Sequence, residues 1–282
     1  MKRPNSCVNL IKAINAIARG RDPVRLSRAM ANVIVGQMLP DGVVKGGSSL
    51  MFRYGSDFTR YTRDVDTARK MDMDLYLERL EDMLDEGWNG FTGSLVNVDP
   101  PQPKGIPQSY VMVPYDIKLN YCGRPWQTVR IEIGHNEIGD ADESDGCLPE
   151  ELAMAFEELS FPAPKPLPIM NLSYQVAQKL HAVSEAGSER AHDLIDLQLI
   201  VKRSMLNLTD VRVKCERLFN YRRNQVWPPK ILKGETWDSV YDSALATVHC
   251  AEQIFPTVDE AVDWVNKFVA DIAVSGQTQR RD

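Results

Sequence analysis

The chain has 282 residues, and its 39 acidic residues outnumber its 33 Lys and Arg residues to give a net charge of −6. With 43% hydrophobic and 26% charged residues, the composition excludes a disordered chain, a collagen-like chain, a coiled coil and a small disulfide-stabilised domain. The length predicts one large domain or two of ordinary size. The acidic balance argues against non-specific nucleic-acid binding by the chain as a whole and leaves local basic patches open.

The cysteines and the N-terminal segment indicate the cellular setting. Lys12, Asn15 and Arg19 interrupt each apolar run near the N-terminus before it reaches the length of a signal peptide or a membrane span. The cysteines are odd in number, widely spaced and without a Cys-x-x-Cys pair: Cys7, Cys122, Cys147, Cys215 and Cys250. We therefore expect free thiols, no membrane association and a cytoplasmic protein.

Helical and strand patterns alternate in the first half of the chain. Asp22-Pro23 supplies an N-cap and an N1 proline, and Gly87 ends a helix that Asp72 begins. Prolines between residues 100 and 107 mark a surface loop. We predict helices over residues 10–17, 24–39, 48–54 and 73–86, and strands at residues 43–44, 62–67, 91–98, 110–121 and 127–133.

The second half of the chain reads as helical. Alternating prolines in residues 161–168 are compatible only with an extended crossing, so we place a domain boundary there. Helices are predicted over residues 173–186, 188–203, 209–221, 235–253 and 257–274. The sequence thus predicts a mixed α/β (α+β) domain over residues 1–165 and a helical domain over residues 166–282.

A glycine pair between a strand and a helix is the first candidate for binding. Gly46 and Gly47 allow close approach of a ligand, and the N-terminus of the following helix presents backbone N–H groups that favour an anion. Ser48 adds a hydroxyl donor. The pattern predicts a site for the phosphates of a nucleotide.

Two Asp-x-Asp pairs follow. Asp64 and Asp66 lie two apart in a predicted strand, so both carboxylates point to one face, where a cation such as Mg²⁺ would relieve their repulsion. A solvated strand end is the alternative. Asp72 and Asp74 are better explained as a helix N-cap and a first-turn acid.

A third carboxylate would complete a metal site and accept a proton from an attacking hydroxyl. Strand alternation places Arg130 and Glu132 on one face of the strand at 127–133, and Glu132 is our candidate. Asp116 on the neighbouring strand is the rival, and a salt-bridged surface role is open for both.

Two motifs resemble a known family. The first reads KGGSSL at residues 45–50, followed by Arg53 and by TRDVD at residues 62–66. The second reads AQKLHA at residues 177–182, followed by RAHDLIDL at residues 190–197. The strand, glycine turn and acids are similar to the polymerase-β-like nucleotidyltransferase superfamily. The finer pattern, over residues 40–200, resembles the AbiEii toxins of AbiE-type toxin–antitoxin and abortive-infection systems.

The resemblance implies roles for individual residues. Gly46, Gly47 and Ser48 would hold the phosphates of a nucleoside triphosphate, and Asp64, Asp66 and Glu132 would bind Mg²⁺. Lys179 and Asp193 would complete the nucleotide site, with Lys179 as a further phosphate contact. His192 stands where the family usually has lysine, which removes a fixed positive charge. A polymerase-β-like domain with a mixed sheet is the implied fold.

Charge is uneven along the chain. Residues 137–158 hold nine acids and no base, whereas Lys202 to Lys233 hold nine bases and two acids, a net charge of +7. Phe219, Tyr221 and Trp227 lie within the basic stretch, so base stacking beside phosphate contacts is conceivable, and a solvated helix face is the alternative. The acidic stretch is a candidate contact for an antitoxin.

These observations predict a magnesium-dependent nucleotidyltransferase toxin that modifies RNA, with the 3′ end of tRNA as the expected acceptor, seated on the stretch from Lys202 to Lys233. A small winged-helix protein is the expected antitoxin. Two alternatives remain: a nucleotidyltransferase acting on a small molecule or a protein, and a non-catalytic nucleotide-binding module.

Overall fold

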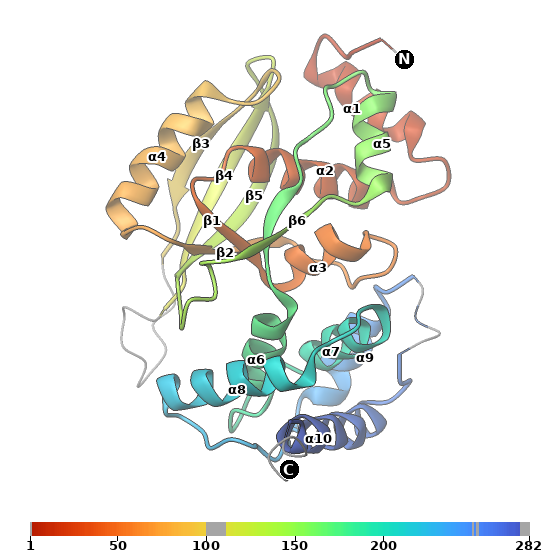
Figure 1. Cartoon of the computed structure of the whole chain (residues 1–282). Coiled ribbons are helices and arrows are strands. Elements are labelled where there is room, and N and C mark those ends of the chain that lie inside the picture. Colours follow the sequence, from red (N-terminus) through yellow and green to blue (C-terminus); the bar gives the residue numbers. More distant parts are fainter. Residues whose placement is uncertain (1, 100–110, 250, 252–253, 277–282) are drawn as a thin grey trace. The chain divides into compact units, whose positions relative to one another are not determined.

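A computed structural model describes residues 2–99, 111–249, 251 and 254–276 (Figure 1). The chain divides into two compact units. The sheet unit comprises Met1–Ser56 and Thr62–Met170, and the helical unit comprises Asp57–Tyr61 and Asn171–Asp282. The predicted surface loop at residues 100–107 lies outside the described residues, as does Cys250.

A seven-stranded mixed sheet forms the centre of the sheet unit, with the strand order β3-β4-β5-β2-β1-β7-β6 (Figure 1). β2 is antiparallel to β1 and parallel to β5. The strands are β1 (Gly42–Lys45), β2 (Asp64–Arg69), β3 (Phe91–Asn97), β4 (Val113–Tyr121), β5 (Arg124–His135), β6 (Ser144–Cys147) and β7 (Leu167–Met170).

The helices of the sheet unit begin where the sequence provides caps. The side chains of Ser6, Asp22 and Asp72 each accept a hydrogen bond from a backbone N–H in the first turn of the next helix. The Asp72-Asp74 pair therefore is an N-cap with a first-turn acid, as predicted. These helices are α1 (Cys7–Ile17), α2 (Pro23–Gln37), α3 (Gly46–Tyr54), α4 (Met73–Glu86) and α5 (Glu150–Glu158).

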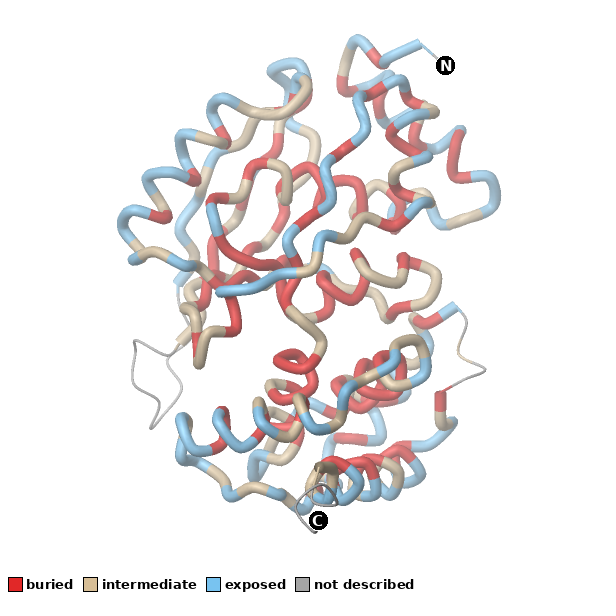
Figure 2. The backbone as a smooth tube through the Cα atoms, viewed as in Figure 1, coloured by how far each residue is buried: buried red, intermediate tan, exposed pale blue. Residues whose placement is uncertain are grey.

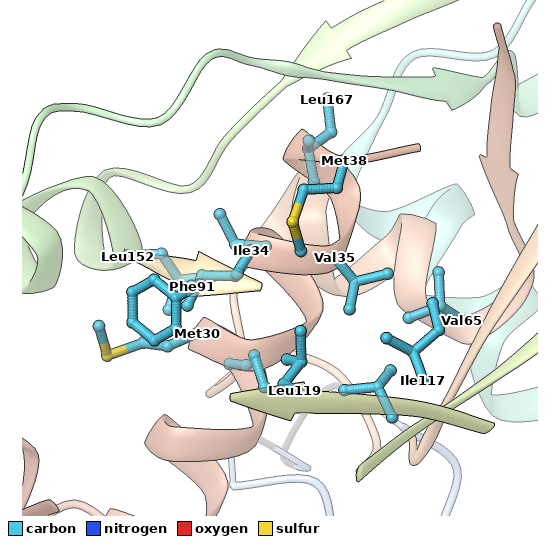
Figure 3. Packing of buried hydrophobic residues seen from close by; sticks show 14 of the residues in the cluster. Met30, Ile34, Val35, Met38, Val65, Phe91, Ile117, Leu119, Leu152 and Leu167 are labelled. Carbon is cyan, nitrogen blue, oxygen red and sulfur yellow. The ribbon is translucent and has the colours of Figure 1, made fainter. Parts of the chain in front are cut away.

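The two faces of the central strands differ in chemistry. Val65, Ile117 and Ile131 are fully buried in the core, and they alternate with charged residues that point to the opposite face. α2 covers the apolar face, as Figure 3 shows for Ile34 and Val35. Figure 2 shows the buried backbone running along β1, which is buried at all of its residues.

Among its described residues, the helical unit contains five α-helices, whose buried sides are apolar except on α6 and α7. Asn171, Asn207 and Thr257 cap three of them with side-chain oxygens. The helices are α6 (Leu172–Val183), α7 (His192–Arg203), α8 (Leu208–Arg222), α9 (Trp237–Leu245) and α10 (Val258–Val274).

Three elements were not predicted, β6, α5 and β7, and the helix predicted over residues 235–253 ends at Leu245. β7 pairs with β1 at Ile169 and with β6, although Pro168 lies within it. A four-residue strand that contains proline has no periodicity to read, so residues 166–170 were expected with the helical part. The two units instead divide between Met170 and Asn171, because β7 is part of the sheet.

Two further findings concern the hydropathy of the helices and the state of the cysteines. Within the described residues, no helix is both long and apolar enough to cross a membrane. The four described cysteines are free thiols.

We expect Phe91→Ala to lower the free energy of unfolding of the sheet unit by about 3–5 kcal/mol. Phe91 is fully buried, and its ring lies 4.5 Å from Tyr121 and 5.2 Å from Trp126 between centroids. Val96 lies on the same strand and is 41% exposed, so Val96→Ala should change the free energy by no more than about 0.5 kcal/mol. Urea unfolding followed by circular dichroism measures both, and equal effects would contradict this account of the core.

Candidate active site

The turn from β1 into α3 has a geometry that only glycine permits. Gly46 has a φ of +65°, and a Cβ at this position would lie 1.9 Å from Oδ2 of Asp66. No side chain caps the N-terminus of α3. The Asp66 carboxylate thus lies directly against the turn, next to the first backbone N–H groups of a helix, which favour an anion.

The hydroxyls of this turn have internal partners. Ser48 is fully buried, and its Oγ donates a hydrogen bond to the backbone carbonyl of Asp64. Ser49 Oγ donates to the carbonyl of Gly46 at 2.8 Å. The Ser48 hydroxyl was predicted as a phosphate donor, but here it ties α3 to β2. The phosphate-binding capacity of the turn therefore rests on its backbone N–H groups.

The pairing of β2 with β5 brings the predicted acids together. The strands are parallel, with Asp64 opposite Arg130 and Asp66 opposite Glu132. Neighbouring strands are separated by about 4.8 Å, so Asp66 and Glu132 emerge side by side on one face, with Asp64 two residues away on the same face. All three side chains are half-buried.

Asp116, the rival third acid, has cationic partners. Its carboxylate accepts a hydrogen bond from Arg130 Nε at 2.7 Å and lies 3.4 Å from Lys118 Nζ. The hydrogen bond from Arg130 lowers the pKa of Asp116, with Lys118 adding to the effect. This pairing favours Glu132 over Asp116 as the third carboxylate.

The acids can be tested for their fit to Mg²⁺. Within the described part of the chain, no group of three or more His, Cys, Asp or Glu side chains is placed to hold a metal ion. Mg²⁺ is, however, commonly held by one or two carboxylates, with phosphate oxygens and water as the remaining ligands. The Asp66 carboxylate beside an anion-binding turn fits that arrangement, because metal and phosphate would meet there.

Lys45 belongs to the same face and received no role from the sequence. It lies opposite Asp66 in the antiparallel pair of β1 and β2, and it is only 8% exposed. Its Nζ is 3.1 Å from the point where a Cβ on Gly134 would lie, so Gly134 leaves room for the ammonium. The signal was its position immediately before the glycine pair, which puts its side chain on the acid-bearing face.

In the helical unit, Lys179 is at the centre of a buried charge cluster. Lys179 Nζ lies 2.8 Å from Asp193 Oδ1 and 2.6 Å from Asp196 Oδ2, and all three side chains are buried. Although burial opposes ionisation, the charges of Lys179 and Arg190 lower the pKa of Asp193. The motif residues Lys179 and Asp193 are therefore brought together, as partners of one another.

Arg60 is a second residue that the sequence did not reveal. Its Nε and Nη2 each lie 3.0 Å from an oxygen of Asp196, which is a bidentate pair. The two residues are 136 positions apart in the chain. No local pattern predicts such a pair, and it explains why Asp57–Tyr61 belongs to the helical unit.

The structure divides the bases of the stretch from Lys202 to Lys233 into two groups. Several are neutralised or packed: Arg212 pairs with Glu216, Lys214 with Asp210, Lys233 with Asp238 and Asp259, while Lys202 and Arg203 lie over the rings of Phe255 and Phe58. Arg217, Arg223 and Lys230 are exposed. Phe219 is part of the core at 1% exposure, whereas Tyr221 is 40% exposed and Trp227 is half-buried.

Many acids between residues 137 and 158 serve the fold. Glu151 accepts hydrogen bonds from the backbone N–H of Ser56 at 2.7 Å and from its hydroxyl at 3.2 Å. Asp145 pairs with Arg53, and Glu158 with Arg19. The stretch is therefore less free to contact a partner than its charge count indicates.

One comparison with known proteins identifies a family. The family model described as nucleotidyl transferase AbiEii toxin, type IV toxin–antitoxin system, matches residues 26–264. Among curated proteins, none matches the chain.

Solved structures share the fold. The nucleotidyltransferase toxin MenT4 of Mycobacterium tuberculosis is 16% identical with a TM-score of 0.52, covering 94% of this chain and 98% of its own. Two Helicobacter pylori proteins also match. One, described as a candidate nucleotidyltransferase, is 17% identical with a TM-score of 0.49, covering 92% of this chain and 98% of its own. The other, JHP933, is 18% identical with a TM-score of 0.46, covering 91% and 94%.

The family model covers most of the chain, including both motifs, and MenT4 has the same fold. The chain thus belongs to the AbiEii nucleotidyl transferase toxin family of type IV toxin–antitoxin systems, and it is a nucleotidyltransferase with a mixed α/β fold.

Proposed function

We propose that this chain transfers a nucleoside monophosphate from a nucleoside triphosphate to a hydroxyl of RNA, with the 3′ end of tRNA as the acceptor, in a magnesium-dependent reaction in the cytoplasm. The observation that carries the proposal is the register of β2 and β5, which sets Asp66 beside Glu132, together with the contact between Asp66 and the Gly46 turn. An acid pair next to an anion site suits the chemistry of triphosphates.

The reaction assigns a task to each group. The acceptor oxygen attacks the α-phosphorus, the bond between that phosphorus and the bridging oxygen breaks, and pyrophosphate leaves. Backbone N–H groups of Gly47 and Ser48 hold the phosphates, and Glu132 accepts the proton of the acceptor hydroxyl. Of the predicted ligands Asp64, Asp66 and Glu132, one or two carboxylates would hold Mg²⁺ together with phosphate oxygens, and the ion when bound neutralises charge on the triphosphate.

The assignment of Lys179 and Asp193 to the nucleotide site stays a prediction, and the existing partners of Lys179 constrain it. The Lys179 ammonium already donates to two carboxylates, so at most one of its three N–H groups is left for a phosphate oxygen. Asp193 is held by Lys179 and by Arg190 Nε at 2.8 Å, which suits a residue that orients the lysine. Within the sheet unit itself, Lys45 supplies positive charge to the acid-bearing face, because it shares a register position with Asp66.

His192 offers no fixed charge for phosphate. Burial lowers the pKa of His192 to about 4, and the nearby Arg60 and Arg190 add to that effect while Asp193 opposes it. The imidazole is therefore neutral at pH 7. Any contact that it makes with a nucleotide would be a hydrogen bond and not an ion pair.

The partners follow from family and charge. Membership in a type IV toxin–antitoxin family implies an antitoxin and a nucleoside triphosphate substrate. A small winged-helix protein is our expectation for the antitoxin. For RNA, the exposed bases of the stretch from Lys202 to Lys233 support phosphate contacts, and Arg217, Arg223 and Lys230 are among them.

Asp66→Asn should abolish transfer, by about 100-fold or more, because it removes a charge at the predicted metal and phosphate site. Asp74→Asn is the matched control, since Asp74 belongs to an Asp-x-Asp pair that serves as an N-cap and first turn, and it should retain full activity. The assay incubates purified protein with each labelled triphosphate, Mg²⁺ and total RNA.

EDTA should stop labelling of RNA and Mg²⁺ should restore it. If the label appears only on a protein or only on a small molecule, that molecule and not RNA is the acceptor. Binding of triphosphate without any transfer, unaffected by Asp66→Asn, would favour a non-catalytic module.

Lys230→Gln should raise the KM for RNA and reduce the dependence of log K on log salt concentration by about one. Lys233→Gln removes an equal charge from the same stretch, but Lys233 is paired with Asp238 at 2.8 Å and Asp259 at 3.0 Å, so little change is expected. Binding of labelled tRNA at several salt concentrations measures both. Identical slopes for the two variants would remove this stretch from the acceptor site.

The neutral state of His192 predicts a pH dependence of stability. Between pH 6.5 and 4, the imidazole of His192 binds a proton in the unfolded chain but not in the folded chain. The free energy of unfolding therefore decreases as the pH falls through that range. The free energy of unfolding that His192→Gln removes should therefore be about 1–2 kcal/mol smaller at pH 5 than at pH 7. Urea unfolding at both pH values measures the difference, and a constant difference would show that His192 titrates normally.

A further inference from the structure

A groove at the C-terminal end of α8 has no role in the proposed chemistry. It has a volume of about 620 Å³, within the range of small-molecule sites, which is about 300–1,000 Å³. It is formed by a single segment of the helical unit, so its shape is local. The lining residues are Glu216, Phe219, Asn220, Arg223, Gln225, Val226 and Trp227.

Contacts with neighbouring residues fix the side chains and the loop that line the groove. The ring of Trp227 meets that of the buried Phe219 in a T-shaped contact with centroids 5.3 Å apart. Gln225 Nε2 donates a hydrogen bond to the carbonyl of His181 at 3.0 Å, which ties the loop to α6. Arg223 ends α8 in the left-handed region, at a φ of +59°, and its N–H donates to the carbonyl of Phe219 at 2.9 Å. The indole is thus presented by a fixed loop.

The exposed residues of the groove include types that often contact nucleic acid. Arg223 and Asn220 are exposed, and Trp227 is half-buried although its neighbour Val226 is 83% exposed. Between residues 216 and 230 there are four bases and one acid. An aromatic ring among exposed cations suits a base that stacks while its phosphate is neutralised.

We propose that this groove seats one unpaired nucleobase of a single-stranded RNA segment. The base stacks on Trp227, Arg223 contacts the adjoining phosphate, and Asn220 with Glu216 contacts the base edge. Because a carboxylate accepts from exocyclic amino groups, cytosine and adenine are favoured over uracil. The inference deepens the proposed function, on which it rests for the choice of RNA as ligand.

The test measures RNA binding without any reaction. Fluorescence anisotropy follows a labelled single-stranded RNA hexamer binding to the full chain in the absence of triphosphate. Trp227→Leu should raise Kd about tenfold or more, as loss of a stacked base does. Trp264 of α10 is also half-buried and stacks on Phe268, so Trp264→Leu, the matched loss of an indole, should leave Kd unchanged.

A second pair of variants tests the phosphate contact. Arg223→Asn removes the charge and keeps a residue that tolerates the left-handed conformation, so it should weaken binding and reduce the salt slope by about one. Lys267→Asn removes an exposed charge from α10 and should have no such effect. If Trp227→Leu fails to fold, Val226→Glu still tests the groove, because Val226 is exposed and a new carboxylate there should weaken RNA binding at least tenfold.

Three results would overturn the inference: equal Kd values for Trp227→Leu and Trp264→Leu, an abasic hexamer that binds as tightly as the RNA, or a free nucleoside triphosphate that competes as tightly as the RNA. The result is separable from the transferase proposal. If RNA binding depends on the groove but no label is transferred, the groove proposal holds and the transferase proposal fails. If label is transferred and Trp227→Leu leaves the KM for RNA unchanged, the transferase proposal holds and the groove proposal fails.

Discussion

The sheet unit depends on the parallel pairing of β2 with β5. Val65 and Ile131 are register partners on the apolar face, and their burial fixes the alignment, because a shift by one residue would turn the acids into the core. The same alignment sets Asp66 beside Glu132 and, through β1, brings Lys45 to that row. Two adjacent carboxylates repel, and Lys45 sets a positive charge beside them, so the packing of one face dictates the electrostatics of the other.

The helical unit depends on a different constraint, the burial of opposite charges. Asp193 and Asp196 are fully buried and are compensated by Lys179, Arg60 and Arg190. Removing one partner would leave a buried charge without compensation, which costs far more than a surface ion pair contributes. A role for Lys179 in substrate binding therefore competes with its role in the fold.

In the stretch from Lys202 to Lys233, the number of bases does not by itself determine how much positive charge is available to a ligand. Nine bases in one stretch predict a nucleic-acid surface, but pairing and packing decide which of them present charge to solvent. Lys230 and Lys233 are both exposed, but the ammonium of Lys233 is held by two carboxylates. Phe219 was grouped with Trp227 as a stacking candidate, yet it lies in the core and supports the half-buried indole. Burial, and not composition, separates the two aromatic residues.

The sequence by itself determined the helix caps, the glycine turn, the common face of Asp64 and Asp66, and the family, because these depend on residues close together in the chain. Only the tertiary structure decided that Glu132 pairs with Asp66, that Arg60 binds Asp196 and that β7 completes the sheet. Each of these joins segments far apart in the chain. Local periodicity reports which way a side chain points along its own element, whereas its neighbour across the sheet is chosen by long-range pairing and burial.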